Sequence, residues 1–249
     1  MNDRRVTAIF AFLAAIAAAI VGISHFLMPR AQLHFATGVT EAFFESLADG
    51  SGAFRMHYWC FVVATVAFTV IVMGGRQLVA TPRSLFYRVA EVWALVGLSV
   101  TAIDFALMQS KALNIAASFG HLDVPARSAV VAIGLPHLDP TGLFGFGLFG
   151  LWLAAFSWAA RGALGSALPW VGILGAVLYE AVFLGSLVHR PMLIDVGAGF
   201  GGVVIAPVWS ATASKVGCRT TFALCGWPMI PVTGPGPRTR FGLPSPSFE

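Results

Sequence analysis

The sequence predicts an all-α membrane protein, a bundle of about six transmembrane helices with both termini in the cytoplasm. Hydrophobic residues make up 57% of the 249 residues and charged residues 10%, whereas an ordinary soluble domain has about 25% charged residues. So few charged groups cannot cover the surface of a soluble globule. The 21 Phe and 7 Trp exclude a disordered chain, which is poor in aromatic residues. The apolar stretches are continuous rather than alternating, which indicates helices and not a β-barrel.

Six stretches are long and apolar enough to cross a membrane, which takes about 20 residues in a helix. They form one predicted transmembrane domain, 1–214, with spans at 6–28, 56–75, 89–109, 142–160, 168–188 and 193–214. The first stretch is longer than the roughly 7–15 apolar residues of a signal peptide, and no Ala-x-Ala-like cleavage site follows it. We therefore expect it to be retained as a span.

Lys and Arg residues predict the orientation, because short cytoplasmic loops carry more of them than outer loops do. With the N-terminus inside, ten of the 15 basic residues fall on the cytoplasmic side and five on the outer side. An even number of spans then places both termini in the cytoplasm. The basic residues are dispersed singly along the chain, so no nucleic-acid partner is predicted.

Two long connections are predicted on the outer side, at 29–55 and 110–141. The first mixes Phe35, Phe43 and Phe44 with acidic residues, which is typical of an amphipathic segment near the interface. The second contains an apolar run at 129–136 that is too short to cross, followed by a turn at 137–141. We interpret it as a cap over the bundle, with a re-entrant piece as the alternative. The cytoplasmic connections are short and make neighbouring helices antiparallel.

The last part of the chain, 215–249, has a different composition. It holds six of the 14 prolines, interleaved with Gly, Ser and Thr, which predicts a disordered cytoplasmic tail. The three cysteines, Cys60, Cys218 and Cys225, lack the spacing of a zinc site and are interpreted as free thiols.

Several short motifs resemble the DUF4386 family of bacterial six-helix membrane proteins. The stretch 86–97, Phe-Tyr-Arg-Val-Ala-Glu-Val-Trp-Ala-Leu-Val-Gly, resembles the Arg-x-x-Glu start of that family's third helix. Residues 4–9 are similar to its opening, and 147–161 with 168–175 to its fourth and fifth helices. The resemblance covers the six-span part of the chain and implies a six-helix fold in a bacterial cytoplasmic membrane, but no activity. The family usually continues apolar after the Trp that corresponds to Trp209, so the tail is either lineage-specific or the product of a shifted reading frame.

Four acidic residues fall inside the predicted spans: Glu91, Asp104, Glu180 and Asp195. Because an ionisable side chain costs about 2.5–3.5 kcal/mol at the centre of a membrane helix, such residues are functional candidates. Glu91 lies one turn from Arg88, and we expect these two to form an ion pair that locks the helix end. A cytoplasmic gate or a contact with lipid headgroups is the alternative.

The other three acids, Asp104, Glu180 and Asp195, fall in the predicted outer half of the membrane together with His25 and His57. Three interpretations stay open. Interhelical hydrogen bonding makes these residues structural. A water-filled pocket open to the outside makes the chain a small proton- or cation-linked transporter. A His/carboxylate metal site makes it a membrane enzyme, although no HxxxH or HExxH spacing supports one. We expect a non-enzymatic protein with no catalytic, cofactor-binding or metal-binding residues, and its ligand, if any, is not indicated.

Small residues recur at helical spacing on the fifth and sixth predicted spans. The pairs are Gly172 with Ala176, Gly197 with Gly201, and Ala198 with Gly202. Such faces let helices approach closely, within one chain or between two copies. A homo-oligomer is therefore a candidate assembly, in addition to the lipid bilayer as the surrounding partner. Pro207 predicts a kink near the end of the sixth span.

Overall fold

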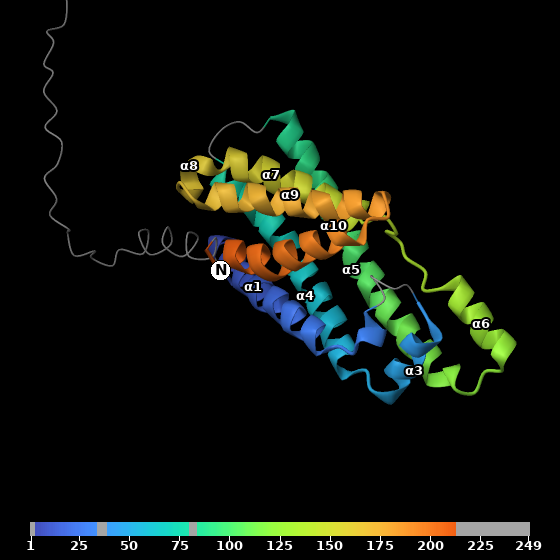
Figure 1. Cartoon of the computed structure of the whole chain (residues 1–249). Helices are drawn as coiled ribbons and strands as arrows, with labels where there is room; N and C mark the ends of the chain where they lie inside the picture. The colour runs from blue at the N-terminus through green and yellow to red at the C-terminus, as the bar shows by residue number, and fades with distance from the viewer. Residues whose placement is uncertain (1–2, 34–38, 80–83, 213–249) are drawn as a thin grey trace, which may run out of the picture.

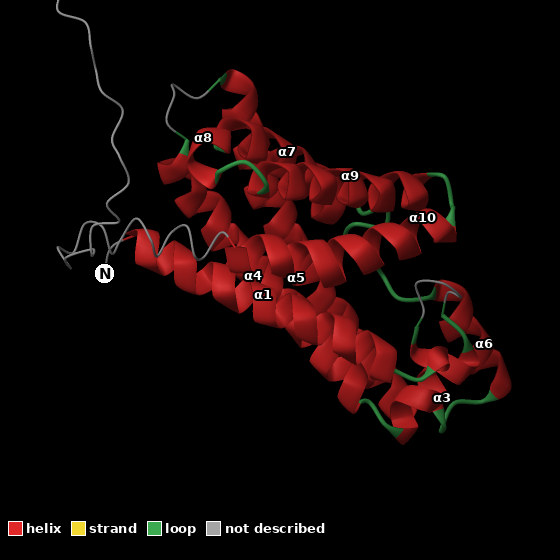
Figure 2. Ribbon diagram, turned by 60° about the vertical axis from the view of Figure 1, so that its left-hand side comes forward, coloured by secondary structure: helices red, strands yellow, loops and turns green. Residues whose placement is uncertain are grey.

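The computed structural model describes residues 3–33, 39–79 and 84–212, and 85% of them lie in helices. No strand occurs within these ranges, which confirms an all-α fold (Figure 2). The tail predicted at 215–249, with Cys218 and Cys225, lies outside the described residues, as do Phe35 and several of the basic residues that predict the orientation.

Three long helices form one part of the bundle: α1 (Asp3–Leu27), α4 (Gly52–Gly75) and α5 (Leu85–Phe119) (Figure 1). All three are apolar and contain no proline. The hydroxyl of Ser84 caps α5 by accepting a hydrogen bond from the N–H of Tyr87 at 3.2 Å, which satisfies one of the unpaired donors at a helix start. The buried face of α1 is rich in alanine and packs along α4. Small side chains at this face allow the two backbones to approach closely.

The second part of the chain begins with a π-helical segment, η3 (Leu143–Leu148), that leads directly into α7 (Phe149–Ala159). After the short α8 (Arg161–Leu164), helix α9 (Leu168–Leu187) packs against α7. Trp152 and Phe156 of α7 stack on one another in the bundle core, with ring centroids 5.0 Å apart.

The last helix begins as α10 (Pro191–Val196) and continues through a second π-helical segment, η4 (Gly197–Ile205), to Thr212. The N–H of Ala206 bonds to the carbonyl of Gly201, five residues back. Pro207 follows directly and has no N–H, and a local π-helical adjustment is one way in which membrane helices accommodate a proline. The kink expected at Pro207 stays a prediction.

Five helices of the described residues are long and apolar enough to cross a membrane: Arg5–Leu27, Gly52–Leu78, Leu85–Phe119, Leu168–Leu187 and Met192–Thr212. They correspond to five of the six predicted spans. The predicted span 142–160 corresponds to η3 and α7, which together are apolar but shorter than the other five. The described part of the chain is thus all-helical, with five candidate membrane-spanning helices. The sixth crossing and the orientation stay predictions.

Helix α5 differs from its prediction in length. It has 35 residues, about 52 Å at 1.5 Å per residue, whereas the hydrocarbon core of a bilayer is about 30 Å thick. The predicted span 89–109 lies within this helix, which begins at Leu85 and continues to Phe119, beyond the part that can lie in hydrocarbon. Beyond residue 109 its buried residues, Ala112, Ala116 and Phe119, recur at the spacing of one helix face.

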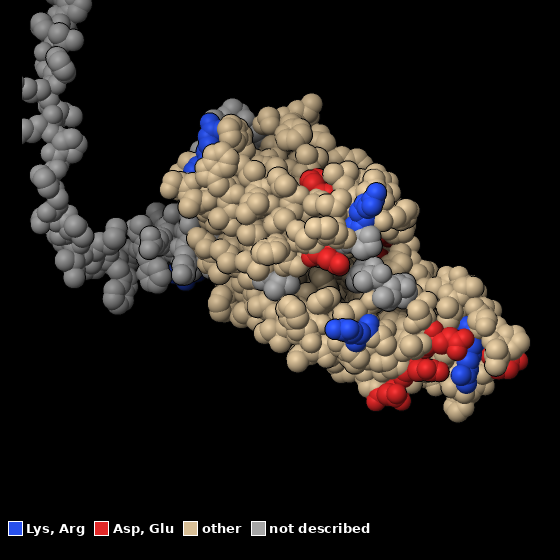
Figure 3. Space-filling view, viewed as in Figure 1, with Lys and Arg blue, Asp and Glu red and all other residues tan. Residues whose placement is uncertain are grey.

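Two short helices, α3 (Glu41–Asp49) and α6 (Val124–Ile133), lie beside the last turns of α5 at the end of the bundle opposite the N-terminus (Figure 1). We call these three parts the cap. Helix α3 is amphipathic, as predicted for 29–55, because Phe43, Phe44 and Leu47 are buried while its acidic residues are exposed. A second hydrophobic cluster, distinct from that of the bundle, joins the buried residues of the cap to the start of α4 and the middle of α5. On the face shown in Figure 3, charged side chains gather over the cap and are sparse over the bundle.

Candidate functional site

The structure does not bring the predicted candidates together. His25 and His57 lie between α1 and α4, Asp104 lies on α5, Glu180 on α9 and Asp195 on α10. Within residues 3–33, 39–79 and 84–212, no group of three or more His, Cys, Asp or Glu side chains is placed to hold a metal ion. Each candidate is therefore described in its own surroundings.

Asp104 contacts the connection between the cap and the bundle. The residue is 6% exposed. Its Oδ1 accepts a hydrogen bond from the main-chain N–H of Leu138 at 2.8 Å, and its Oδ2 lies 3.5 Å from Nδ1 of His137. Both partners belong to the non-helical segment between α6 and η3. An unsatisfied main-chain N–H in hydrocarbon costs several kcal/mol, so the carboxylate stabilises this segment where it meets α5.

Asp139 connects the same segment to the start of η3. Its Oδ2 accepts a hydrogen bond from the N–H of Gly145 at 2.9 Å, and its carbonyl accepts one from Gly142 at 3.1 Å. Gly142 has φ of 69°, which favours glycine. The first N–H groups of a helix lack intrahelical acceptors, and Asp139 supplies one. We call Asp104, His137, Leu138, Asp139 and Gly145 the polar junction.

The sequence predicted a turn at 137–141 but not the role of Asp139. An Asp shortly before an apolar helical run is typical of an N-terminal cap, and that signal was available. The contact with Asp104 bridges 34 positions and has no local signature.

His57 joins α4 to α1. It is 4% exposed, and its Nδ1 lies 3.1 Å from the carbonyl of Val21 and 3.1 Å from Oγ of Ser24. Ser24 donates to the same carbonyl at 3.0 Å, and because a carbonyl oxygen only accepts, Nδ1 carries the hydrogen in its contact with Val21. The exposed His25 lies beside it, with ring centroids 5.8 Å apart. This geometry is the interhelical hydrogen bonding that was one of the three interpretations.

Glu180 and Asp195 lie apart from the polar junction. Glu180 is half-buried on α9 and faces Gly150 of α7, where a Cβ would lie 3.1 Å from its Oε1. Asp195 is exposed on α10. The absence of a side chain at Gly150 therefore leaves room for the Glu180 carboxylate between the two helices.

The expected ion pair between Arg88 and Glu91 is replaced by one between Arg76 and Glu91. The side chain of Glu91 is 5% exposed, and Arg76 Nε donates to its Oε1. Arg88 is exposed, and on α5 it lies on a different face from the buried residues Tyr87, Glu91 and Ala94. Arg76 reaches Glu91 because the short 3₁₀ turn Arg76–Leu78 follows α4 directly and places its side chain over the start of α5.

A cavity of about 60 Å³ lies inside the bundle, between α1, α4, α5, α7, α9 and the two π-helical segments. Its lining is apolar apart from Thr65, Thr101 and Tyr179. Both threonine hydroxyls donate to carbonyls of their own helices, Thr65 to Phe61 at 2.7 Å and Thr101 to Gly97 at 2.8 Å. None of the candidate acids lines the cavity. This cavity is therefore separate from the acids, and a water-filled pocket around them stays a prediction.

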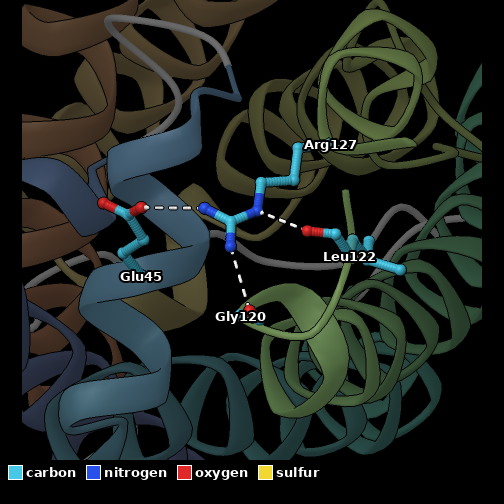
Figure 4. Close-up of polar contacts among 4 residues, drawn as sticks. All are labelled: Glu45, Gly120, Leu122 and Arg127. Carbon is cyan, nitrogen blue, oxygen red and sulfur yellow. Dashed lines mark hydrogen bonds and ion pairs between the residues drawn. The ribbon is translucent and has the colours of Figure 1, made fainter. Parts of the chain in front are cut away.

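Arg127 fastens the cap and was not singled out from the sequence. Its Nε donates to the carbonyl of Leu122 at 3.0 Å and its Nη2 to the carbonyl of Gly120 at 2.9 Å, while Nη1 lies 3.8 Å from Oε1 of Glu45 (Figure 4). Its guanidinium also lies 5.5 Å from the ring centre of Phe119. One side chain on α6 thus holds the end of α5 and the neighbouring α3. The position of an Arg in a short, mostly apolar stretch is the sequence feature that could have indicated this role.

The predicted small-residue faces pack within the chain. A Cβ at Gly197 would lie 2.5 Å from the carbonyl oxygen of Leu178 on α9, and a Cβ at Gly172 would lie 2.0 Å from Oγ of Ser157 on α7. At Gly202, by contrast, a Cβ would meet no atom within 4 Å, and this residue lines the cavity.

Comparison of the chain with protein-family models, with curated proteins and with solved structures found no match. The resemblance to the DUF4386 family stays a prediction.

Proposed function

We propose that the chain is a non-enzymatic, multi-pass membrane protein whose role is association or support. The observation that carries this proposal is the use of Asp104. Its oxygens accept a hydrogen bond from the main chain of Leu138 and face His137, so the most buried of the three acids predicted in the outer half stabilises the connection between the cap and the bundle. The separation of the other candidates supports the same conclusion, because a catalytic site needs its groups within reach of one reacting atom.

The cap is the part best suited to contact a partner. It extends from the bundle on the long α5, exposes charged residues of α3, and exposes Val124 and Ile133 of α6. The distribution of basic residues supports a cap on the outer side of a cytoplasmic membrane, and the family resemblance supports a bacterial one. A second copy of the chain is a candidate partner.

Two conservative substitutions test this proposal: Asp104→Asn and Glu180→Gln, with Asp195→Asn as the matched control on an exposed site. Asn at 104 keeps an oxygen for the N–H of Leu138 and removes the charge. We expect both test variants, purified and reconstituted into vesicles, to differ from the wild type only in thermal stability or assembly. Proton and cation flux through the vesicles, followed with a trapped pH dye, should be the same in all four proteins.

One observation favours the alternative of a small proton- or cation-linked transporter. Asp104 and His137 form a pair of titratable groups 3.5 Å apart at the edge of the bundle, and intramembrane carboxylates often serve ion pathways. A pH-dependent flux in the wild type that Asp104→Asn abolishes, with an unchanged melting temperature, would favour the transporter and contradict our proposal.

The orientation is tested separately, by labelling single cysteines in intact cells after the natural cysteines are replaced. A cysteine at Gln77, in the connection predicted to be cytoplasmic, should react with a membrane-impermeant maleimide only after permeabilisation. A cysteine at exposed Arg55, near the cap, should react from outside. The reverse pattern would overturn the expected orientation and place the cap in the cytoplasm.

A further inference from the structure

We propose that the central cavity binds the end of a hydrocarbon chain from a membrane lipid. The cavity lies among helices that are candidate membrane spans, and side chains of Ala18, Ala64, Phe68 and Leu98 form much of its wall. The hydroxyls of Thr65 and Thr101 are already used by main-chain carbonyls. The lining thus offers dispersion contacts and few free polar groups, which selects an apolar ligand.

The size of the cavity limits what it can hold. At about 60 Å³ it is less than half the size of an apolar cavity of about 150 Å³ that stays free of water and binds benzene. A whole headgroup or a sterol does not fit, but the last few carbons of an acyl chain do. Water has little to gain there, because a buried water molecule needs two to four polar partners.

The walls of the cavity include both π-helical segments of the described residues. Gly145 and Phe146 come from η3, and Gly202 comes from η4. π-Helical turns are rare and occur mostly at functional sites. Their meeting at one cavity indicates a shaped site rather than a gap left by imperfect packing.

One side of the cavity is closed and another is open to a chain. Where α5 meets η3 the contact is tight, because a Cβ at Gly145 would lie 2.6 Å from Oγ1 of Thr101. At Gly202 a Cβ would meet nothing within 4 Å, and Gly202, Phe61 and Phe146 are the lining residues that keep partial exposure.

The surrounding medium identifies the occupant. Gly202 belongs to the candidate span Met192–Thr212, and its neighbours Phe200 and Val204 are exposed apolar residues. In a bilayer these side chains face lipid tails. Acyl chains are therefore the apolar molecules present at the wall where the cavity is open.

The test is photolabelling of the full chain in vesicles. One arm uses a phospholipid with a diazirine near the end of one acyl chain, and the other uses the free fatty acid with the same group. We expect labels on cavity residues such as Thr65 and Tyr179, mapped by mass spectrometry, and labels on exposed Trp170 as the internal reference for lipid contact. The arm that labels the cavity distinguishes a bilayer lipid from a free fatty acid.

Two leucine variants of η4 make the test specific. Gly202→Leu adds a large side chain at a lining position of the cavity and should lower cavity labelling roughly tenfold, the effect of about 1.4 kcal/mol of competition. Gly199→Leu adds the same side chain at an exposed position where a Cβ also meets nothing and should leave the labelling unchanged. Trp170 should be labelled equally in all three proteins.

A variant with a smaller side chain controls for misfolding of Gly202→Leu. Gly202→Ala adds one methyl group into open space and should lower cavity labelling partially without lowering the melting temperature, because alanine is a better helix former than glycine. The proposal is overturned if neither arm labels the cavity residues. It is equally overturned if labelling of Thr65 and Tyr179 persists in a folded Gly202→Leu protein.

Discussion

The attachment of α6 to the rest of the cap depends on Arg127, and its removal has a calculable effect. Arg127→Ala deletes two hydrogen bonds to main-chain carbonyls, at 3.0 and 2.9 Å, worth about 1 kcal/mol each. It also deletes the contact with the ring of Phe119, worth about 0.5 kcal/mol, and the ion pair with the exposed Glu45, worth about 0.5 kcal/mol. We expect local opening of α6 to become easier by about 3 kcal/mol.

Hydrogen exchange of the α6 amides measures this opening directly, because exchange of protected amides reports the free energy of local unfolding. A change of about 3 kcal/mol corresponds to roughly 100-fold faster exchange. Arg127→Lys keeps the charge, but a lysine cannot donate from two positions of a planar guanidinium. We therefore expect roughly tenfold faster exchange of the α6 amides in this variant. Glu45→Gln removes only the ion pair and should make exchange of the α6 amides about twofold faster. The order of the three variants is a sharper test than any single value.

Arg55→Ala is the matched control, because Arg55 is also basic but is exposed, and its Nε donates to Ser51 within the same turn. Exchange in α6 should not change in this variant. Equal exchange in Arg127→Ala and the wild type would refute the attachment by Arg127. Faster exchange throughout the bundle in Arg127→Ala would show instead that the cap and the bundle unfold together.

Two further predictions concern the bundle. Gly97→Ala should lower the free energy of unfolding by about 3 kcal/mol or more, because its Cβ would lie 2.2 Å from a main-chain oxygen of η3, which cannot move aside like a side chain. Gly199→Ala is the control, because a Cβ there meets nothing within 4 Å, and it should not destabilise the protein. SDS titration in mixed micelles compares the two variants. Arg76→Ala should lower the free energy of unfolding by about 1–3 kcal/mol, because it leaves the buried carboxylate of Glu91 without its ion-pair partner. Arg88→Ala should change the free energy of unfolding by less than about 0.5 kcal/mol. Equal losses for the two variants in the same titration would contradict the pairing of Arg76 with Glu91.

The fold was largely predictable because hydrocarbon imposes one strong rule, that a spanning segment be apolar and helical. That rule indicated the five long helices among its six spans, but it does not indicate how far α5 continues beyond the apolar stretch. Four of the ten residues 110–119 are polar, namely Ser110, Lys111, Asn114 and Ser118, so a search for continuous apolar runs stops before them. The helix continues because Ala112, Ala116 and Phe119 form a face that the cap covers. A search for helical periodicity finds this extension where a search for hydropathy does not.

The candidate site was less predictable because its contacts join distant parts of the chain. Arg88 was the expected partner of Glu91 because it comes three positions earlier in the same helix. Glu91, however, lies on the buried face of α5, whereas Arg88 lies on another face. The same limit applies to Asp104, whose partners follow it by more than 30 positions. Sequence identified which polar residues are costly in a membrane. It did not identify which groups satisfy them.

The placement of the acids gives the polar junction its physical meaning. Where the chain leaves helical geometry between α6 and η3, main-chain N–H groups lose their helical acceptors, and Asp104 and Asp139 each accept one of them. A carboxylate beside non-helical backbone therefore has a structural use that competes with chemistry, since an oxygen that accepts from an N–H is less available to a proton or a cation. Asp104→Asn separates the two uses, because the amide oxygen retains the hydrogen bond and loses the charge. If Asp104 is mainly structural, Asp104→Asn should have a free energy of unfolding close to that of the wild type. Asp104→Ala leaves the N–H of Leu138 without its acceptor and should lower the free energy of unfolding by about 1–3 kcal/mol.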